Sequence, residues 1–257
     1  MIKKSKPLIL VVNDDGFFSP GIKFLISVMN QLGDVYVVAP NSNRSGLSHA
    51  MTLDKDIYIE KIDSVLNHFI CSGTPVDCVK IAINKILPRL PDLCVSGVNH
   101  GSNHSINALY SGTLHGAMEG TIKGIPSISF SHLSYSYNVD LSPFNKIVND
   151  LVVKILKNGL PFGLTLNVNF PSIPFPAVKG IRICKQAKGY WSEEFKLTMK
   201  DDSKEYYNIS GSFEHDAKDL DTDAWALENN YISIVPISID SSALNNFNQL
   251  NYLQYDF

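Results

Sequence analysis

Short apolar runs alternate along this chain with segments of helical periodicity, and this alternation is the feature that most limits its fold. Residues 8–12 form a continuous apolar run, typical of a strand buried on both faces of a parallel sheet. Residues 21–32 carry apolar side chains at helical spacing, with Pro20 before them and Gly33 after them. A second apolar run follows at residues 35–39. The three segments predict a β-α-β unit.

The same alternation continues to about residue 170. We expect further helices over residues 74–87, 111–123 and 144–157, and further strands over residues 93–96, 125–130 and 164–169. Residues 57–59 and 69–70 favour a peripheral hairpin. Strands that alternate with helices form a parallel sheet with helices on both faces. The sequence therefore predicts an α/β fold with a doubly wound, mostly parallel (Rossmann-like) sheet.

The composition is that of a folded protein without a general affinity for polyanions. Hydrophobic residues make up 44% of the chain and the formal net charge is −3, which gives no attraction to a nucleic-acid polymer. No stretch approaches the roughly 20 apolar residues that span a bilayer, and the apolar run after Lys6 is too short for a signal peptide. We expect a cytoplasmic protein with no membrane contact. Cysteines without C-x-x-C spacing are expected to be reduced, buried thiols: Cys71, Cys78, Cys94 and Cys184.

Two adjacent carboxylates follow the first predicted strand directly. Asp14 and Asp15 lie just beyond its carboxyl end, where open α/β sheets place their ligand crevices, and Gly16 permits the turn that brings both to one centre. Two carboxylates forced together repel each other unless a cation neutralises them, which a divalent metal ion would do. For the tripeptide alone, a polar turn that merely closes a strand is the competing interpretation.

Further polar loops are predicted at the same edge of the sheet. Residues 40–46 include Arg44 and Ser45, and residues 96–103 offer a neutral oxygen from Asn99 and amide donors from Asn103. Residues 110–113 lie where a helix begins, so that hydroxyls and free backbone N–H groups form an anion site, although Ser111 also suits an ordinary N-cap. Several polar loops at one edge indicate a binding site rather than unrelated turns.

The candidate metal ligands are all oxygen donors: Asp14, Asp15, Ser45 and Asn99. Such a set suits one hard divalent cation, Mg²⁺ or Mn²⁺. Its two carboxylates balance the charge of the ion, so a phosphate group can enter without displacing a protein ligand. We expect water activated by the metal to attack the phosphorus atom, and backbone N–H groups at residues 111–113 to stabilise the charge that develops there.

A change in composition after Phe170 divides the chain of 257 residues. Several prolines precede a polar, aromatic-rich stretch. We assign residues 1–170 to the metal- and phosphate-binding α/β core and residues 171–257 to an appended β-rich lobe. Within this lobe, residues 231–239 are expected to return to the main sheet as a strand, and residues 245–257 to form a tail that needs a partner surface.

Taken together, these motifs resemble the SurE family of survival-protein nucleotidases. The resemblance rests on residues 13–16, 20–21, 39–46, 73–78, 96–103 and 110–120, and it resumes at residues 222–223 and 231–236. It implies a phosphatase of nucleoside 5′- and often 3′-monophosphates, and some family members also act on short polyphosphate. It further implies a homodimer or homotetramer built by exchange of C-terminal segments.

The resemblance also implies roles for single residues. Metal binding carries over to Asp14, Asp15, Ser45 and Asn99, and of these Asp14, Asp15 and Asn99 are the candidate catalytic residues. Contacts to the phosphate and substrate are implied for Arg44, Ser45, Asn103, Ser111, Gly112 and Thr113. The chain departs from the family pattern at residues 104–107, which leaves the substrate range open. Four histidines occur near the motifs where the family gives no expectation: His49, His100, His104 and His115.

Other functions compete with this hypothesis. A phosphatase with an aspartate nucleophile normally carries D-x-D, whereas here the two carboxylates are adjacent. A non-enzymatic phosphoacceptor module would need an acceptor aspartate after a central strand, and a dinucleotide-binding domain would need G-x-G-x-x-G after residue 12. Base preference stays open, since aromatic residues that could stack on a base also suit packing within the lobe: Tyr190, Trp191, Tyr206 and Tyr207.

Overall fold

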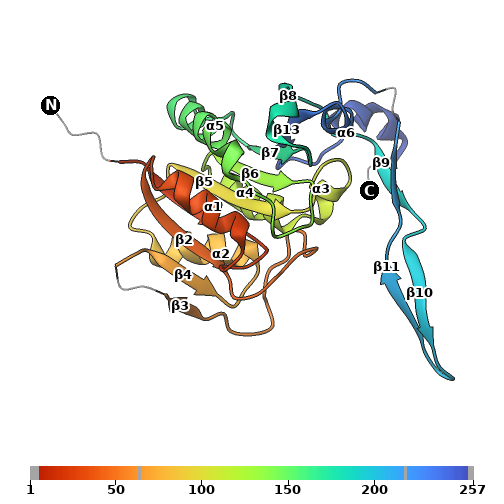
Figure 1. The fold of residues 1–257 in the computed structure, drawn as a ribbon, viewed down its shortest axis with the longest axis horizontal. Helices are drawn as coiled ribbons and strands as arrows, with labels where there is room; N and C mark the ends of the chain where they lie inside the picture. The colour runs from red at the N-terminus through yellow and green to blue at the C-terminus, as the bar shows by residue number, and fades with distance from the viewer. Residues whose placement is uncertain (1–5, 63–64, 217–218, 254–257) are drawn as a thin grey trace.

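A nine-stranded sheet forms the centre of the computed structural model, which describes residues 6–62, 65–216 and 219–253 (Figure 1). The strand order is β3-β4-β2-β1-β5-β6-β7-β13-β8. The consecutive strands β4, β2, β1, β5, β6 and β7 run parallel to one another. At the two sides of this group, β3 is antiparallel to β4 and β13 is antiparallel to β7. The strands are β1 (Leu8–Val12), β2 (Asp34–Pro40), β3 (Ile59–Lys61), β4 (His68–Cys71), β5 (Leu93–His100), β6 (Ser127–His132), β7 (Leu164–Phe170), β8 (Gly180–Ile183) and β13 (Tyr231–Ser238).

Helices cover both faces of this sheet. Helices α1 (Pro20–Met29) and α5 (Asn145–Asn158) contribute to one apolar cluster, and α2 (Pro75–Ile81) contributes to the other, where it packs beside α4 (Gly112–Ile122). Strand β1 serves both clusters, because its successive side chains point to opposite faces of the sheet. The prediction of a doubly wound α/β fold is confirmed.

The helix predicted over residues 74–87 begins where its sequence indicates. Thr74 is the N-cap of α2: its hydroxyl accepts from the Asp77 backbone N–H at 3.2 Å, and the Asp77 carboxylate accepts from the Thr74 N–H at 2.9 Å. After Ile81 the hydrogen-bond pattern changes, and residues Ala82–Ile86 form a π-helix. The predicted extent is correct, but the segment is not a uniform α-helix.

Strand β5 is longer than predicted. The sequence indicated a strand that ends at Ser96, whereas β5 continues to His100. Beyond an irregularity in register after Ser96, pairing with the parallel neighbour β6 resumes, so that Asn99 lies opposite Ser131. Asn99 is therefore fixed at the end of a strand rather than placed in a loop.

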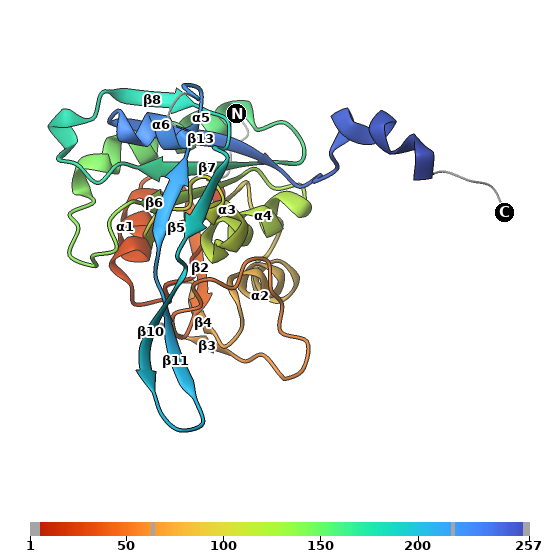
Figure 2. The same cartoon turned by 90° about the vertical axis from the view of Figure 1, so that its right-hand side faces the viewer.

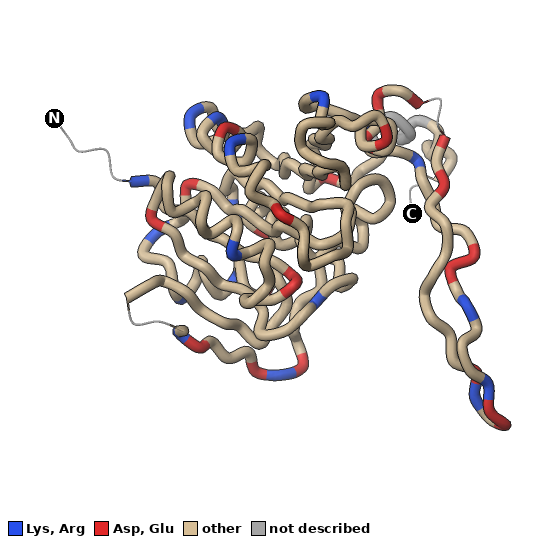
Figure 3. The backbone as a smooth tube through the Cα atoms, viewed as in Figure 1, with Lys and Arg blue, Asp and Glu red and all other residues tan. Residues whose placement is uncertain are grey.

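The segment after β8 forms a long arm that projects from the body of the molecule (Figures 1 and 2). Its base pairs β9 (Gly189–Ser192) with β12 (Ser212–His215), and its tip pairs β10 (Phe195–Lys200) with β11 (Glu205–Ile209), both antiparallel. Acidic and basic residues are interspersed along the arm, and Lys and Arg are dispersed over the rest of the described chain (Figure 3). The predicted β-rich lobe is thus present.

The chain re-enters the main sheet after the arm. Helix α6 (Asp223–Glu228) leads into β13, the return strand that the sequence predicted, and then a 3-10 helix, Leu244–Leu253, runs away from the body (Figure 2). The end of the predicted tail, residues 254–257, lies outside the described residues. The domain boundary at residue 170 and the exchange of the tail between subunits stay predictions. Among the described residues, no helix is both long and apolar enough to cross a membrane.

Candidate active site

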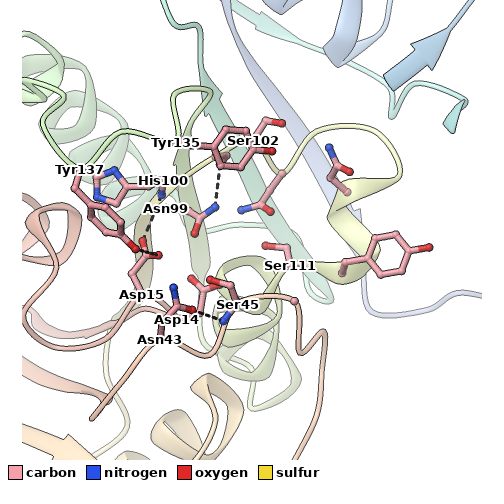
Figure 4. Close-up of a pocket in the computed structure, with 15 residues that line it drawn as sticks. Asp14, Asp15, Asn43, Ser45, Asn99, His100, Ser102, Ser111, Tyr135 and Tyr137 are labelled. Carbon is pink, nitrogen blue, oxygen red and sulfur yellow. Dashed lines mark hydrogen bonds between the residues drawn. The ribbon is translucent and has the colours of Figure 1, made fainter. Parts of the chain in front are cut away.

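A cavity of about 380 Å³ opens where the central strands β1 and β5 end. Its size is within the range of about 300–1,000 Å³ that is typical of small-molecule sites. Its lining comes from loops that are far apart in sequence (Figure 4): Asp14, Asp15, Asn43, Ser45, Gly46, Asn99, His100, Gly101, Ser102, Asn103, Asn107, Tyr110, Ser111, Tyr135 and Tyr137. The carboxyl edge of the parallel sheet is therefore the site, as the topology requires.

The chain turns sharply after β1 and so presents both aspartates to the cavity. Asn13 fixes the turn, because its side-chain amide donates to the Gly16 carbonyl and to the Ser19 hydroxyl, each at 2.9 Å. Asp14 is 3% exposed and Asp15 is half-buried. Both carboxylates line the same space, as the sequence predicted.

Burial raises the pKa of both carboxyl groups. The pKa of Asp14 rises to about 7, first because the group is buried and then because Asp15 is beside it. Burial also raises the pKa of Asp15 to about 6. The hydrogen bonds that oppose this rise are long, 3.3 Å from the His100 backbone N–H and 3.4 Å from the Tyr137 hydroxyl. A cation between them would remove the penalty of keeping both ionised.

The first turn of α4 supports Asp14. The Thr113 hydroxyl donates to Asp14 Oδ1, and a side chain at position 112 would be obstructed, because a Cβ on Gly112 would lie 2.9 Å from Asp14 Cβ. Ser111 caps the helix by accepting from the Leu114 N–H at 3.0 Å. Of the three residues predicted to contact phosphate here, Ser111 lines the cavity, whereas Gly112 and Thr113 contact Asp14 behind it.

The loop after β2 places Ser45 at the cavity and turns Arg44 away from it. The backbone N–H of Arg44 donates to the Asp14 carbonyl at 2.7 Å, and that of Ser45 donates to Asn43 Oδ1 at 2.7 Å. The Arg44 guanidinium instead donates to the Ser72 carbonyl at 3.1 Å and to Asn41 Oδ1 at 3.3 Å. Arg44 is not among the lining residues, so its predicted phosphate contact stays a prediction.

Two asparagines are oriented by hydrogen bonds from their side-chain amides. Asn99 Nδ2 donates to the Gly101 carbonyl at 2.8 Å, which turns Asn99 Oδ1 to the side of the cavity where Asp15 lies (Figure 4). Asn103 Nδ2 donates to the Ser131 hydroxyl at 2.7 Å. Both predicted residues line the cavity.

The donor set around the two aspartates fits a hard divalent cation. Asp14, Asp15, Ser45 and Asn99 all line the cavity and offer carboxylate, hydroxyl and amide oxygens. Within the described part of the chain, no group of three or more His, Cys, Asp and Glu side chains is placed to hold a metal. The donor chemistry of these residues fits an oxygen-ligated ion, whose presence stays a prediction.

Comparison with known proteins decides the family. The family model described as "Survival protein SurE" matches residues 9–193. The chain belongs to the SurE family. The protein named 5′-nucleotidase SurE from Flavobacterium johnsoniae is 49% identical over 97% of this chain and 98% of its own length. That from Bacteroides thetaiotaomicron is 41% identical over 97% of each chain. The crystal structure of the SurE protein from Aquifex aeolicus superposes with a TM-score of 0.84 at 38% identity and covers 96% of this chain and 99% of its own.

The four histidines for which the SurE pattern gave no expectation have different surroundings. Only His100 lines the cavity, with its Nδ1 at 3.1 Å from the Ser136 carbonyl. His49 pairs with the buried Glu119 at 3.1 Å, and His104 packs against Phe213 on the arm. His115 Nδ1 lies 2.7 Å from the Ser111 carbonyl. Of these four histidines, His100 is therefore the one that lines the cavity of the SurE site.

Several lining residues were not predicted from the sequence. Tyr135 and Tyr137 come from the loop after β6, which has no periodicity or motif. The order of strands in the sheet could have indicated these residues. Strand β6 lies beside β5 and runs parallel to it, so the loop that follows β6 reaches the same edge of the sheet. Conversely, the aromatic residues of the arm do not line the cavity of this SurE-family protein, although Trp191 Nε1 donates to the lining residue Asn107 at 2.8 Å.

Proposed function

We propose that this chain is a metal-dependent 5′-nucleotidase that hydrolyses nucleoside 5′-monophosphates, and also 3′-monophosphates, to nucleoside and phosphate. The observation that carries the proposal is the cavity that two adjacent carboxylates, the buried Asp14 and the half-buried Asp15, line together with Ser111 at the start of a helix. The relatives cited above are named 5′-nucleotidase SurE, and this chain matches nearly their whole length.

The proposal includes one divalent ion, Mg²⁺ or Mn²⁺, held by Asp14, Asp15, Ser45 and Asn99. Support comes from their shared cavity and from the raised pKa values of the two aspartates, which a bound cation would lower again. When bound, such an ion polarises a phosphate oxygen and makes a nearby water molecule more acidic.

Asp15 is the carboxylate better suited to orient the attacking water and take its proton. Asp14 is more deeply buried and is held by the Thr113 hydroxyl. Asp15 receives only the two long hydrogen bonds described above, so its oxygens retain capacity for a further donor. In this proposal Asp14 is a ligand and Asp15 both a ligand and the proton acceptor.

In this proposal Ser111 and Asn103 contact the phosphate. The Ser111 oxygen already accepts from the Leu114 N–H, so its own O–H is free to donate into the cavity. Asn103 uses one amide hydrogen on Ser131 and retains the other. Donors aimed at the phosphate oxygens stabilise the charge that develops in the transition state.

We also propose that the protein is a homodimer or homotetramer formed through its C-terminal segments and that it acts in the cytoplasm. Apolar side chains on the arm and tail are exposed, among them Phe195 at 66%, Ile209 at 83% and Tyr252 at 79%. Apolar surface of this kind favours association with a second copy. The four free, buried cysteines suit a reducing compartment.

Phosphate release from a panel of nucleoside monophosphates and from p-nitrophenyl phosphate, with and without chelator, tests the proposed activity. We expect release from the nucleotides that chelation abolishes and that Mg²⁺ or Mn²⁺ restores. Activity that is indifferent to chelator, or no activity on any nucleotide, would contradict the proposal. Light scattering coupled to size exclusion tests the oligomeric state separately.

A further inference from the structure

The cavity has a charged end and an uncharged end. In Figure 4, Asp14, Ser45 and Asn43 lie at one end, and Tyr135 and Ser102 lie at the opposite end. The only acidic lining residues are the two aspartates, and no described lining residue is Lys or Arg. A phosphate group bound near the aspartates therefore leaves the rest of its molecule in a neutral space of hydroxyl, amide and aromatic groups.

The ring of Tyr135 packs closely against the backbone at Gly101. A Cβ added to Gly101 would lie 2.5 Å from Tyr135 Cε1, so the ring packs where any other residue would place its side chain. Gly101 has φ of +110°, a conformation that glycine adopts most readily. The side chain of Tyr135 is nevertheless 70% exposed. The ring thus has backbone support at Gly101, while most of the residue stays accessible to a ligand.

The other lining tyrosines are less suited to receive a planar ligand. Tyr137 packs on the His100 ring at 4.4 Å between centroids, and its hydroxyl reaches Asp15 at 3.4 Å. Tyr110 is exposed, and its ring is not among the nearest atoms around any glycine of the described chain. Tyr135 is therefore the ring with a supported face at the neutral end.

We propose that Tyr135 is the platform on which the nucleobase of the substrate stacks, and that it selects nucleoside monophosphates over phosphate esters that lack a base. The proposal rests on the nucleotidase activity proposed above and assigns the part of the same site that recognises the base. Every nucleobase has an aromatic face, so a single ring accepts purines and pyrimidines alike. The absence of Lys and Arg from the described lining makes a second phosphate an unsuitable occupant of this end.

Steady-state kinetics of Tyr135→Ala and Tyr135→Phe on the full chain, saturated with Mg²⁺, test the platform. Stacking on an aromatic side chain changes affinity by about 5- to 150-fold per base, so we expect Tyr135→Ala to raise KM for AMP about 10-fold. KM for ribose 5-phosphate, which has no base, should change less than about twofold by the same reasoning. Tyr135→Phe keeps the ring face and should restore wild-type values. Inhibition by adenosine, which has no phosphate, should weaken in Tyr135→Ala in parallel with AMP.

Tyr190→Ala is the matched control, because Tyr190 is an exposed tyrosine of the arm that does not line the cavity. It should leave both substrates unaffected. An equal rise in KM for AMP and ribose 5-phosphate in Tyr135→Ala, or a selective rise in Tyr110→Ala alone, would overturn the platform while the nucleotidase activity stands. Wild-type protein without activity on AMP would overturn both proposals.

Discussion

The Asp223 carboxylate accepts a hydrogen bond of 2.8 Å from the backbone N–H of Ser105, a residue 118 positions earlier in the chain. The same carboxylate accepts from the Ala187 N–H at 2.9 Å, and the Ser105 hydroxyl donates to the Ala187 carbonyl at 2.9 Å. Asp223 begins α6, and Ala187 precedes the arm. The loop that carries Asn103 is therefore fastened to the base of the arm, so the arm and the active site form one connected structure.

The first prediction concerns a further contact between the arm and the active site, the 2.8 Å hydrogen bond from Trp191 Nε1 to Asn107. Trp191→Phe removes the donor but keeps a ring that can pack on Phe213, which lies 5.8 Å away between centroids. A typical hydrogen bond contributes about 0.5–1.5 kcal/mol, so we expect KM for AMP to rise about two- to tenfold. The thermal unfolding midpoint should change little.

Tyr190→Phe is the matched control for this substitution. It removes a hydrogen bond of similar length, 2.9 Å from the Tyr190 hydroxyl to Glu214, on the same arm but away from the cavity. KM should stay at the wild-type value. A rise in KM of the same size in both variants would mean that general loosening of the arm, and not the contact with Asn107, is responsible.

The second prediction separates catalysis from stability at Asp14. Asp14→Asn should abolish phosphate release, because it removes a proposed metal ligand. In metal-free protein at pH 8, however, the thermal midpoint should be unchanged or higher, since burial already disfavours the ionised carboxylate that asparagine replaces. Activity and calorimetry on the same preparation measure the two effects. Retained turnover would show that Asp14 is not needed as a ligand.

The third prediction concerns pH. The folded pKa values of Asp14 and Asp15, about 7 and about 6, lie above the usual value of 3.8. Such groups stabilise the fold below the unfolded pKa, and this stabilisation is lost as the pH rises through the folded pKa. Metal-free protein should thus lose stability from these groups between about pH 4 and pH 7.

Mg²⁺ should reverse that loss, because it binds the ionised pair and only the folded state. Each kcal/mol of binding energy raises the thermal midpoint of a chain of this size by about 2–4 °C. We expect saturating Mg²⁺ to raise the midpoint by several degrees at pH 8, and by less than half as much at pH 5.5, where the ion must displace protons. A shift that is independent of pH, or equally large in Asp14→Asn, would contradict the proposed ligands.

The sequence predicted the position of the site because the relevant signals are local. The apolar strand before Asp14 fixes where the carboxylates emerge, and the polar residue at a helix start fixes Ser111. Both signals depend on residues within one turn or strand, where backbone hydrogen bonding and burial decide the conformation. The doubly wound class of the fold followed from the same alternation of strands and helices.

Contacts between distant segments could not be predicted in this way. The Arg44 guanidinium is directed by the carbonyl of Ser72, a main-chain group that becomes a neighbour only after the sheet forms. Tyr135 reaches the cavity only because β6 pairs with β5. The irregular register that extends β5 to Asn99 likewise depends on pairing with β6 rather than on the residues of β5 alone.

The fourth prediction concerns Glu119, a buried residue of α4 whose side chain is 2% exposed. Burial alone would raise its pKa, but hydrogen bonds from His49 and Lys80 outweigh burial and hold the pKa below its usual value. The ion pair with Lys80 is 2.8 Å long. Glu119→Gln keeps the shape but removes the charge, and we expect it to lower the free energy of unfolding by about 1.5–3 kcal/mol, measured by urea titration.

Asp150→Asn is the matched control, because it breaks the exposed Lys146–Asp150 pair of 2.6 Å and should cost less than about 0.5 kcal/mol.

A second measurement, of Mg²⁺ binding, tests whether the effect of Glu119→Gln reaches the active site. His49 belongs to the same loop as Ser45, so release of His49 from Glu119 should also weaken Mg²⁺ binding, whereas Asp150→Asn should leave it unchanged. Equal losses of stability in the two variants would show that burial gives the Glu119 pairs no advantage over a surface pair. A loss of stability without weaker Mg²⁺ binding would confine the role of Glu119 to the packing of α4.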